Sequence, residues 1–234
     1  MLSRMIFALG TGRCGTYTAF RILEAQKDVA ASHEGFPLPW KRDLPMLWYL
    51  FVNAQARCEA KILANSSFVW LNYTGAIMGH IPDPKFICLK RPREQVVNSF
   101  CKHTPNLNHW TDPESLHWDP NQDTHAVTAA KWPKYDLPKA EAIGAYWDEY
   151  YAKAEYLQSR YPGNFRIYNM LDVLNTEAGQ RDMLSFAGFA EKDQRLYLNR
   201  KLNALGKPKG HLNPEDDYVY PKPIILEGAQ TPGP

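Results

Sequence analysis

The stretch RMIFALGTGRCGTYTAFRIL, residues 4–23, decides the fold. Its apolar start at residues 4–9 predicts a buried strand, and the apolar spacing over residues 16–25 predicts an amphipathic helix. The loop between them carries three glycines, Gly10, Gly12 and Gly15. This spacing, G-x-G-x-x-G, fits the dinucleotide fingerprint and nearly fits a phosphate-binding P-loop. The anion that the loop holds therefore has to be decided from the residues around the glycines.

The alternation of strand and helix continues along the chain. Further strands are expected at residues 28–32, 68–73, 85–90 and 165–170, and helices at residues 43–64, from Pro92 onward, at 139–159 and at 177–187. This order predicts an α/β fold, a single P-loop-like domain whose central, mainly parallel sheet is flanked by helices. Ligands of such folds bind at the carboxyl ends of the strands, where both informative loops are expected.

The length of 234 residues suits one substantial core. We expect one domain over residues 1–212, with an excursion at about residues 102–138, and a proline-rich tail at residues 213–234. The excursion repeats His-Trp and is expected to be a lid or an acceptor-binding loop.

Composition excludes several classes of protein. A net charge of +2 argues against a general nucleic-acid binder. No apolar run is long enough to span a bilayer, and no signal-peptide layout is present, so a cytoplasmic location is expected. The four cysteines have neither C-x-x-C pairing nor zinc-ligand spacing, which indicates reduced thiols and no metal site.

A dinucleotide site is the first interpretation of the glycine loop. Glu34 falls at the end of the second expected strand, about where the ribose-binding acid belongs. Polar residues, Thr16 to Thr18, follow the last glycine where that fold packs apolar ones, and Arg13 lies inside the loop. An NAD(P)-dependent oxidoreductase is therefore kept as an alternative interpretation.

A nucleoside-triphosphate P-loop is the second interpretation. The phosphate-binding lysine would then be replaced by Thr16 and the Mg²⁺-binding hydroxyl residue by Tyr17. A triphosphate would be poorly neutralised without these two side chains.

The third interpretation keeps the loop geometry and changes the anion. Arg13 contributes a cation, the amides of residues 15–18 open the helix, and two threonine hydroxyls add donors. Such a pocket suits a terminal phosphate or sulfate without a metal. A sulfuryl group in transfer carries less negative charge than a phosphoryl group, so one arginine with backbone amides can suffice.

The segment GTGRCGTYT, residues 10–18, resembles the 5′-phosphosulfate loop of sulfotransferases that use 3′-phosphoadenosine 5′-phosphosulfate (PAPS). A second segment, RPREQVVNS at residues 91–99, has the arginine and serine spacing with which that family holds the donor's 3′-phosphate. The resemblance assigns donor binding to Arg13, Cys14, Gly15, Thr16, Tyr17 and Thr18, to Arg91 and Ser99, and to Arg200 and Lys201 in a basic C-terminal segment. It implies PAPS as co-substrate, no metal, and a small-molecule, glycan or peptide acceptor with a hydroxyl or amine.

The resemblance also implies the catalytic residues. Members of the glutamate-base type have a glutamate just after the second strand, so Glu34 is expected to take the acceptor's proton, with His33 as a weaker candidate. Arg13 would stabilise the leaving phosphate. The segment expected to follow the third strand, LNYTGA, has no histidine, and Asn72 stands there where some members have a lysine. A non-catalytic nucleotide-binding module is a further alternative.

Cys14 has two interpretations. A thiol at a helix N-terminus beside an arginine could have a lowered pKa. The favoured interpretation is a small residue that replaces the serine of the family's loop.

Overall fold

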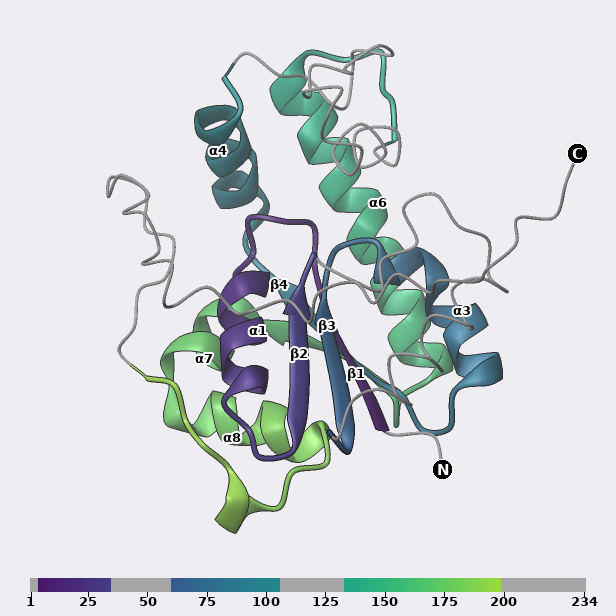
Figure 1. The fold of residues 1–234 in the computed structure, drawn as a ribbon. Helices are drawn as coiled ribbons and strands as arrows, with labels where there is room; N and C mark the ends of the chain where they lie inside the picture. The colour runs from purple at the N-terminus through teal and green to yellow at the C-terminus, as the bar shows by residue number, and fades with distance from the viewer. Residues whose placement is uncertain (1–3, 35–59, 106–132, 199–234) are drawn as a thin grey trace, which may run out of the picture. The chain divides into compact units, whose positions relative to one another are not determined.

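Five parallel strands form the centre of the protein (Figure 1). The strands are β1 (Arg4–Leu9), β2 (Val29–His33), β3 (Ile62–Ser66), β4 (Lys85–Lys90) and β5 (Phe165–Asn169). The computed structural model describes residues 4–34, 60–105 and 133–198, which all belong to one compact unit, Met1–Arg200. The predicted fold class, a central parallel sheet flanked by helices, is confirmed.

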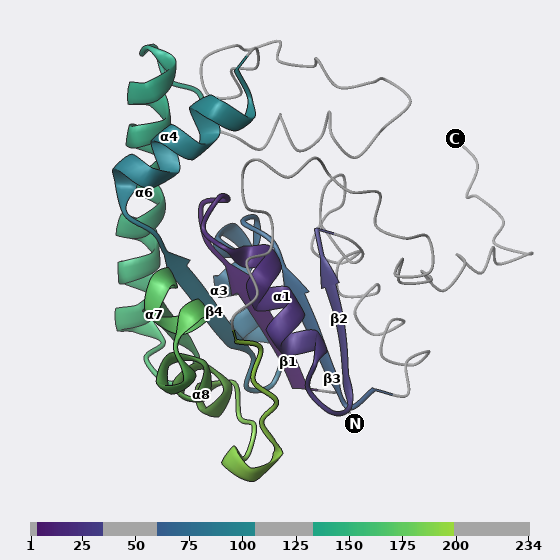
Figure 2. The same ribbon diagram turned by 90° about the vertical axis from the view of Figure 1, so that its left-hand side faces the viewer.

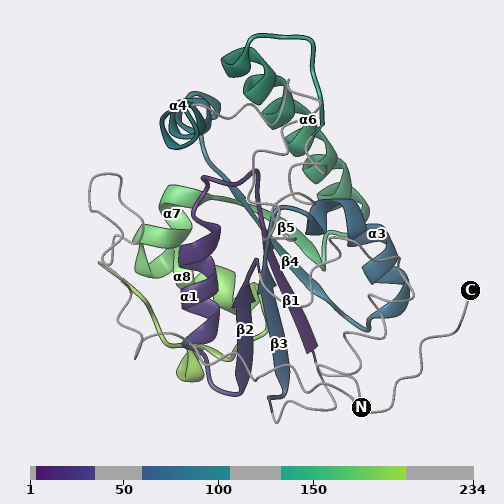
Figure 3. The same ribbon diagram turned by 45° about the horizontal axis from the view of Figure 1, so that its top comes forward.

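Helices cover both faces of this sheet (Figures 1 and 3). One face carries α1 (Thr16–Glu24), α7 (Met170–Asn175) and α8 (Glu177–Phe186), and the other carries α3 (Trp70–His80) and α6 (Lys139–Arg160). The helix α4 (Arg93–His103) packs beside α6, and Figure 2 shows it crossing the first half of that helix. A short 3₁₀ turn, Glu191–Asp193, follows α8.

Burial on both faces of the sheet explains the continuous apolar run at residues 5–9 of β1. Ile6 and Ala8 belong to the core beneath α1 and α8, whereas Phe7 and Leu9 belong to the core beneath α3 and α6. A strand buried on both faces needs apolar side chains at every position.

The order of the strands across the sheet is β2-β3-β1-β4-β5. The usual dinucleotide-binding order is 3-2-1-4-5-6, with the second strand beside the first. In this protein β3 lies between β1 and β2. The loop after β1 and the acid after β2 therefore follow strands that are not neighbours, unlike the arrangement that the dinucleotide fingerprint requires.

The third strand was predicted wrongly. Residues 68–73 were expected to be a strand and residues 43–64 a helix, but β3 is Ile62–Ser66 and α3 begins at Trp70. The buried side chains of Trp70, Thr74 and Ile77 recur at helical spacing, so an aromatic-rich run concealed a period of 3.6. Of the segment expected to be helical, residues 43–59 lie outside the described residues.

Most other boundaries agree with the sequence to within a few residues. Pro92 is the N-cap of α4 rather than its first helical residue, and Met170 begins α7 instead of ending β5. The excursion at residues 106–132 and the tail lie outside the described residues, so the domain limits stay predictions.

Candidate functional site

The candidate site lies where three neighbouring strands end. Parallel pairing places Ala8 of β1 beside Ser66 of β3, and Leu9 beside Cys88 of β4. The glycine loop, the residues after β3 and the arginine after β4 therefore leave the same edge of the sheet. This edge is where ligands of open α/β sheets bind.

The glycine loop is shaped by close contacts that exclude side chains. Gly15 has φ +84° at the N-cap of α1, and a Cβ there would lie 2.3 Å from Cδ1 of Leu174. A Cβ at Gly10 would lie 2.3 Å from Sγ of Cys14. These positions require glycine because the chain turns through left-handed backbone against packed neighbours.

The N-terminus of α1 follows the glycine loop directly, with Gly15 as its N-cap. The first intrahelical bond runs from the amide of Ala19 to the carbonyl of Gly15, at 3.0 Å. No side chain caps the helix, and its first turn contains no acidic residue. The amides of Thr16 to Thr18 and the positive end of the helix dipole are therefore suited to an anion.

The two predicted donor motifs meet in the structure. Nε of Arg13 donates to Oγ of Ser99 at 3.1 Å, and Nη1 of Arg91 donates to the carbonyl of Arg13 at 2.8 Å. Nε of Arg91 also donates to Oε1 of Gln95 at 3.2 Å. One connected cluster thus contains the cation of the glycine loop and both residues of the second motif. We call Arg13, Arg91 and Ser99 the arginine–serine cluster.

The cluster concentrates positive charge. Burial lowers the pKa of Arg13, and repulsion by the Arg91 guanidinium lowers it further, while Glu34 partly offsets this. Within residues 4–34, 60–105 and 133–198, no ion pair to a carboxylate is found for either arginine. Two close guanidinium groups of this kind favour an anionic ligand with more than one charge.

Glu34 follows β2 directly, as predicted. Its amide donates to the carbonyl of Ser66 at 2.9 Å, and its φ is +49°. The residue keeps contact with solvent, yet the surrounding protein raises the pKa of its carboxyl, and the charge of Arg13 opposes this with a smaller effect. A carboxylate with a raised pKa next to a cationic pocket is suited to accept a proton.

His33 is less suited to that role. Its ring packs edge-on against Tyr17, with centroids 5.3 Å apart, and near the ring of Phe20. Burial lowers the pKa of His33 to about 4, and a hydrogen bond with the Ser66 backbone opposes this with a smaller effect. The imidazole is therefore neutral at physiological pH and a weak base.

Cys14 is a packing residue. The side chain is fully buried, and burial raises the pKa of its thiol to about 11. The possibility of a lowered pKa is therefore wrong, because the lost hydration outweighs the helix terminus. Cys14, Cys88 and Cys101 are free thiols.

The residues after β3 differ from those considered in the sequence. Asn72 lies in α3, where its side chain accepts a hydrogen bond from Lys153 at 2.8 Å, so it is not at the strand end. Ser66 and Ser67 occupy that end instead, and Oγ of Ser66 donates to the carbonyl of Thr16 at 2.9 Å. The misplaced strand caused this error. Arg200 and Lys201 lie outside the described residues.

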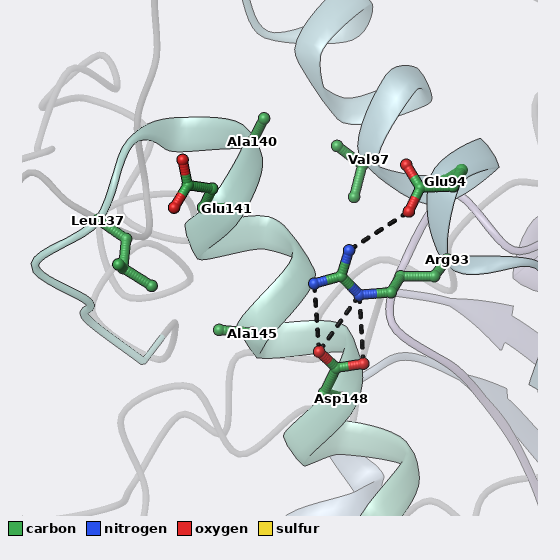
Figure 4. A pocket seen from close by; sticks show the side chains of 8 residues that line it. All are labelled: Arg93, Glu94, Val97, Leu137, Ala140, Glu141, Ala145 and Asp148. Carbon is green, nitrogen blue, oxygen red and sulfur yellow. Dashed lines mark hydrogen bonds and ion pairs between the residues drawn. The ribbon is translucent and has the colours of Figure 1, made fainter.

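A separate hollow of about 420 Å³ lies between α4 and α6 (Figure 4). Arg93 crosses it and donates from Nε to both oxygens of Asp148 at 3.2 Å. The remaining lining residues are Glu94, Val97, Leu137, Ala140, Glu141 and Ala145. This hollow does not include the arginine–serine cluster.

Residues 4–34, 60–105 and 133–198 contain no group of three or more His, Cys, Asp or Glu side chains that could hold a metal ion. None of the helices in those ranges is long and apolar enough to cross a membrane.

Comparison with known proteins gives a likeness in fold. No protein-family model matches the chain, and no curated protein matches its sequence. A solved structure does match: the crystal structure of a sulfotransferase from Alicyclobacillus acidocaldarius, with a TM-score of 0.51 and 16% sequence identity. The match covers 85% of this chain and 87% of the other. The chain therefore has a fold similar to that of this sulfotransferase.

Proposed function

We propose that this protein is a sulfotransferase that moves a sulfuryl group from PAPS to a hydroxyl or amine acceptor. The observation that carries the proposal is the arginine–serine cluster beside the uncapped N-terminus of α1. It offers two adjacent anion sites, and PAPS carries two phosphate groups, at its 5′ and 3′ positions. The similarity in fold to a sulfotransferase supports the same conclusion.

In the proposed division of work, the loop from Arg13 to Thr18 holds the 5′-phosphosulfate. Arg91 and Ser99 hold the 3′-phosphate; Oγ of Ser99 accepts from Arg13 and keeps its own hydrogen to donate. Cys14 acts by packing in this loop. The basic residues Arg200 and Lys201 stay predicted donor contacts.

In the proposed reaction the Glu34 carboxylate takes the acceptor's proton. The acceptor oxygen or nitrogen then forms a bond to sulfur while the bond from sulfur to the bridging phosphate oxygen breaks. The electron pair of that bond goes to the 5′-phosphate, and 3′,5′-adenosine bisphosphate leaves. Arg13 and the amides of α1 stabilise the charge on that leaving group. No metal is assigned a role, and the cytoplasmic location stays a prediction.

The first test removes Arg91. We expect Arg91→Ala to weaken binding of 3′,5′-adenosine bisphosphate by about 10- to 100-fold, because a charge-assisted hydrogen bond contributes about 1.5–3 kcal/mol. Arg93→Ala is the matched control, since that guanidinium lies two residues away and pairs with Asp148. Titration calorimetry measures both. Equal losses in the two variants would contradict the assignment.

The second test separates an enzyme from a binding module. Glu34→Gln should keep the affinity for the bisphosphate and lose sulfuryl transfer from labelled PAPS by at least about 100-fold, as expected for removal of a general base. Transfer that persists in the variant would remove Glu34 from the mechanism.

A further inference from the structure

Helix α6 donates side-chain hydrogen bonds to the loops of the candidate site. The Tyr146 hydroxyl donates to the carbonyl of Thr11 in the glycine loop, at 3.2 Å. Nε1 of Trp147 donates to the carbonyl of Arg91, at 3.0 Å. Thr11 lies in the glycine loop, two residues before Arg13, and the proposed function assigns Arg91 to the donor's 3′-phosphate.

These carbonyls lie beyond the end of the sheet pairing. The strands β1 and β4 end at Leu9 and Lys90, so Thr11 and Arg91 cannot use the ladder to satisfy their carbonyls. Thr11 is fully buried, and a buried carbonyl needs a donor from elsewhere. Burial raises the pKa of Tyr146 well above the usual phenol value, so its hydroxyl stays a donor at every working pH.

The Trp147 indole is itself held in place. Its ring packs on that of Tyr151, with centroids 4.7 Å apart, and Nζ of Lys90 lies 5.2 Å from its centroid. Lys90 is anchored in turn by Glu155, at 2.8 Å. The indole N–H therefore points at the Arg91 carbonyl from a fixed support on α6.

We propose that Trp147 and Tyr146 are positioning residues for the donor. Trp147 holds the backbone from which the Arg91 guanidinium reaches the 3′-phosphate, and Tyr146 holds the glycine loop around the 5′-phosphate. This inference rests on the proposed function. It assigns the two phosphate sites to two different side chains of one helix, so each should affect a different part of the nucleotide.

The test compares two probes, 3′,5′-adenosine bisphosphate and 5′-AMP, which differ only in the 3′-phosphate. Trp147→Phe should weaken binding of the bisphosphate about tenfold and leave 5′-AMP within about twofold, so the preference for the bisphosphate falls. Tyr146→Phe should weaken both probes by a similar factor and keep the preference. Calorimetric dissociation constants give both ratios.

Tyr150→Phe is the matched control. Its hydroxyl is also buried on α6 but donates to the carbonyl of Phe68, after β3, at 3.1 Å. The control should lose a similar amount of thermal stability and keep both affinities. A Tyr150→Phe variant that loses the preference as much as Trp147→Phe would overturn the proposal, because any disturbance of α6 would then have the same effect.

Two other results distinguish a failure of the positioning role from a failure of the proposed function. A wild-type protein without preference for the bisphosphate would overturn both. A wild-type preference that survives in folded Trp147→Phe would overturn the positioning role alone. Should Trp147→Phe fail to fold, replacement of Trp147 by β-(3-benzothienyl)alanine keeps the ring shape, removes the N–H and must give the same loss of preference.

Discussion

Arg13 and Glu34 share an unusual backbone conformation. Their φ angles are +56° and +49°, in the left-handed region where a side chain costs about 1–2 kcal/mol. Such strain persists where the surrounding contacts enforce it, and it is concentrated at functional sites. Here the loop bond to Arg91 and the bond from the Glu34 amide to Ser66 enforce it. The two residues assigned to the chemistry are thus held against their local preference.

The first prediction concerns the pH dependence of transfer. The surrounding protein raises the pKa of the Glu34 carboxyl above the ordinary value of 4.5, although the residue keeps contact with solvent. A general base must be ionised, so kcat/KM should fall as the pH drops through this raised pKa, and the acid limb should lie above pH 4.5. A profile of kcat/KM against pH measures the limb.

Replacement of Arg13 should move the acid limb in a defined direction. Its charge lowers the pKa of Glu34, so Arg13→Gln should move the acid limb of the residual activity to higher pH. Glu34→Gln should have no such limb. A limb that stays in place in Glu34→Gln would assign the titration to another group.

Some residues of the site could be predicted from the sequence, and others could not. Arg13 and Ser99 are 86 positions apart, and only the resemblance of both motifs to one family linked them before the structure joined them. Trp147 had no comparable signal. It lies in a helix whose aromatic residues read as core, and the sequence does not contain the direction of an indole N–H.

At the scale of elements, the sequence predicted four of the five strands closely and misplaced β3. Strands such as β1 and β4 are buried on both faces, so they can be predicted from apolar runs in the sequence. The strand β3, with the sequence ILANS, has polar residues at its carboxyl end because that end borders the site. Gly75 and Gly79 within α3 weakened the helical signal that follows. The prediction of β3 therefore failed where residues of the site replace the apolar residues typical of a buried strand.

Gly15 at the N-cap of α1 and Gly144 inside α6 should respond differently to replacement by alanine. Gly15→Ala should destabilise the protein by about 2–4 kcal/mol, since it adds left-handed strain and an overlap with Leu174. Gly144→Ala in α6 should stay within about 1 kcal/mol of the wild type. The three atoms nearest to its Cβ would belong to the end of the flexible Arg93 side chain, and better helix propensity offsets a weakened exposed ion pair. Urea unfolding measures both, and similar losses at the two positions would contradict this argument.

For the molecule as a whole, the architecture limits which nucleotides can fit. The parallel sheet has a separate core on each face, and the glycine loop and the arginine–serine cluster lie at its carboxyl edge. In the order β2-β3-β1-β4-β5, β3 lies between the strand that leads to the glycine loop and the strand that leads to Glu34, whereas a dinucleotide enzyme has its first two strands side by side. Strand order depends on long-range pairing and was not available from the glycine motif.

The last prediction concerns which nucleotides stabilise the intact protein against unfolding. A ligand at 100 times its dissociation constant adds about 2.7 kcal/mol to the free energy of unfolding, which raises the melting temperature by several degrees in a chain of this size. We expect such a rise with 3′,5′-adenosine bisphosphate, a smaller one with 5′-AMP at equal concentration, and none with NAD or ATP–Mg²⁺. The bisphosphate engages both arginines, whereas 5′-AMP engages only the glycine loop. Only a site that contains both motifs can prefer the nucleotide with the second phosphate. A rise with NAD and none with the bisphosphate would therefore mean that the three glycines bind a dinucleotide.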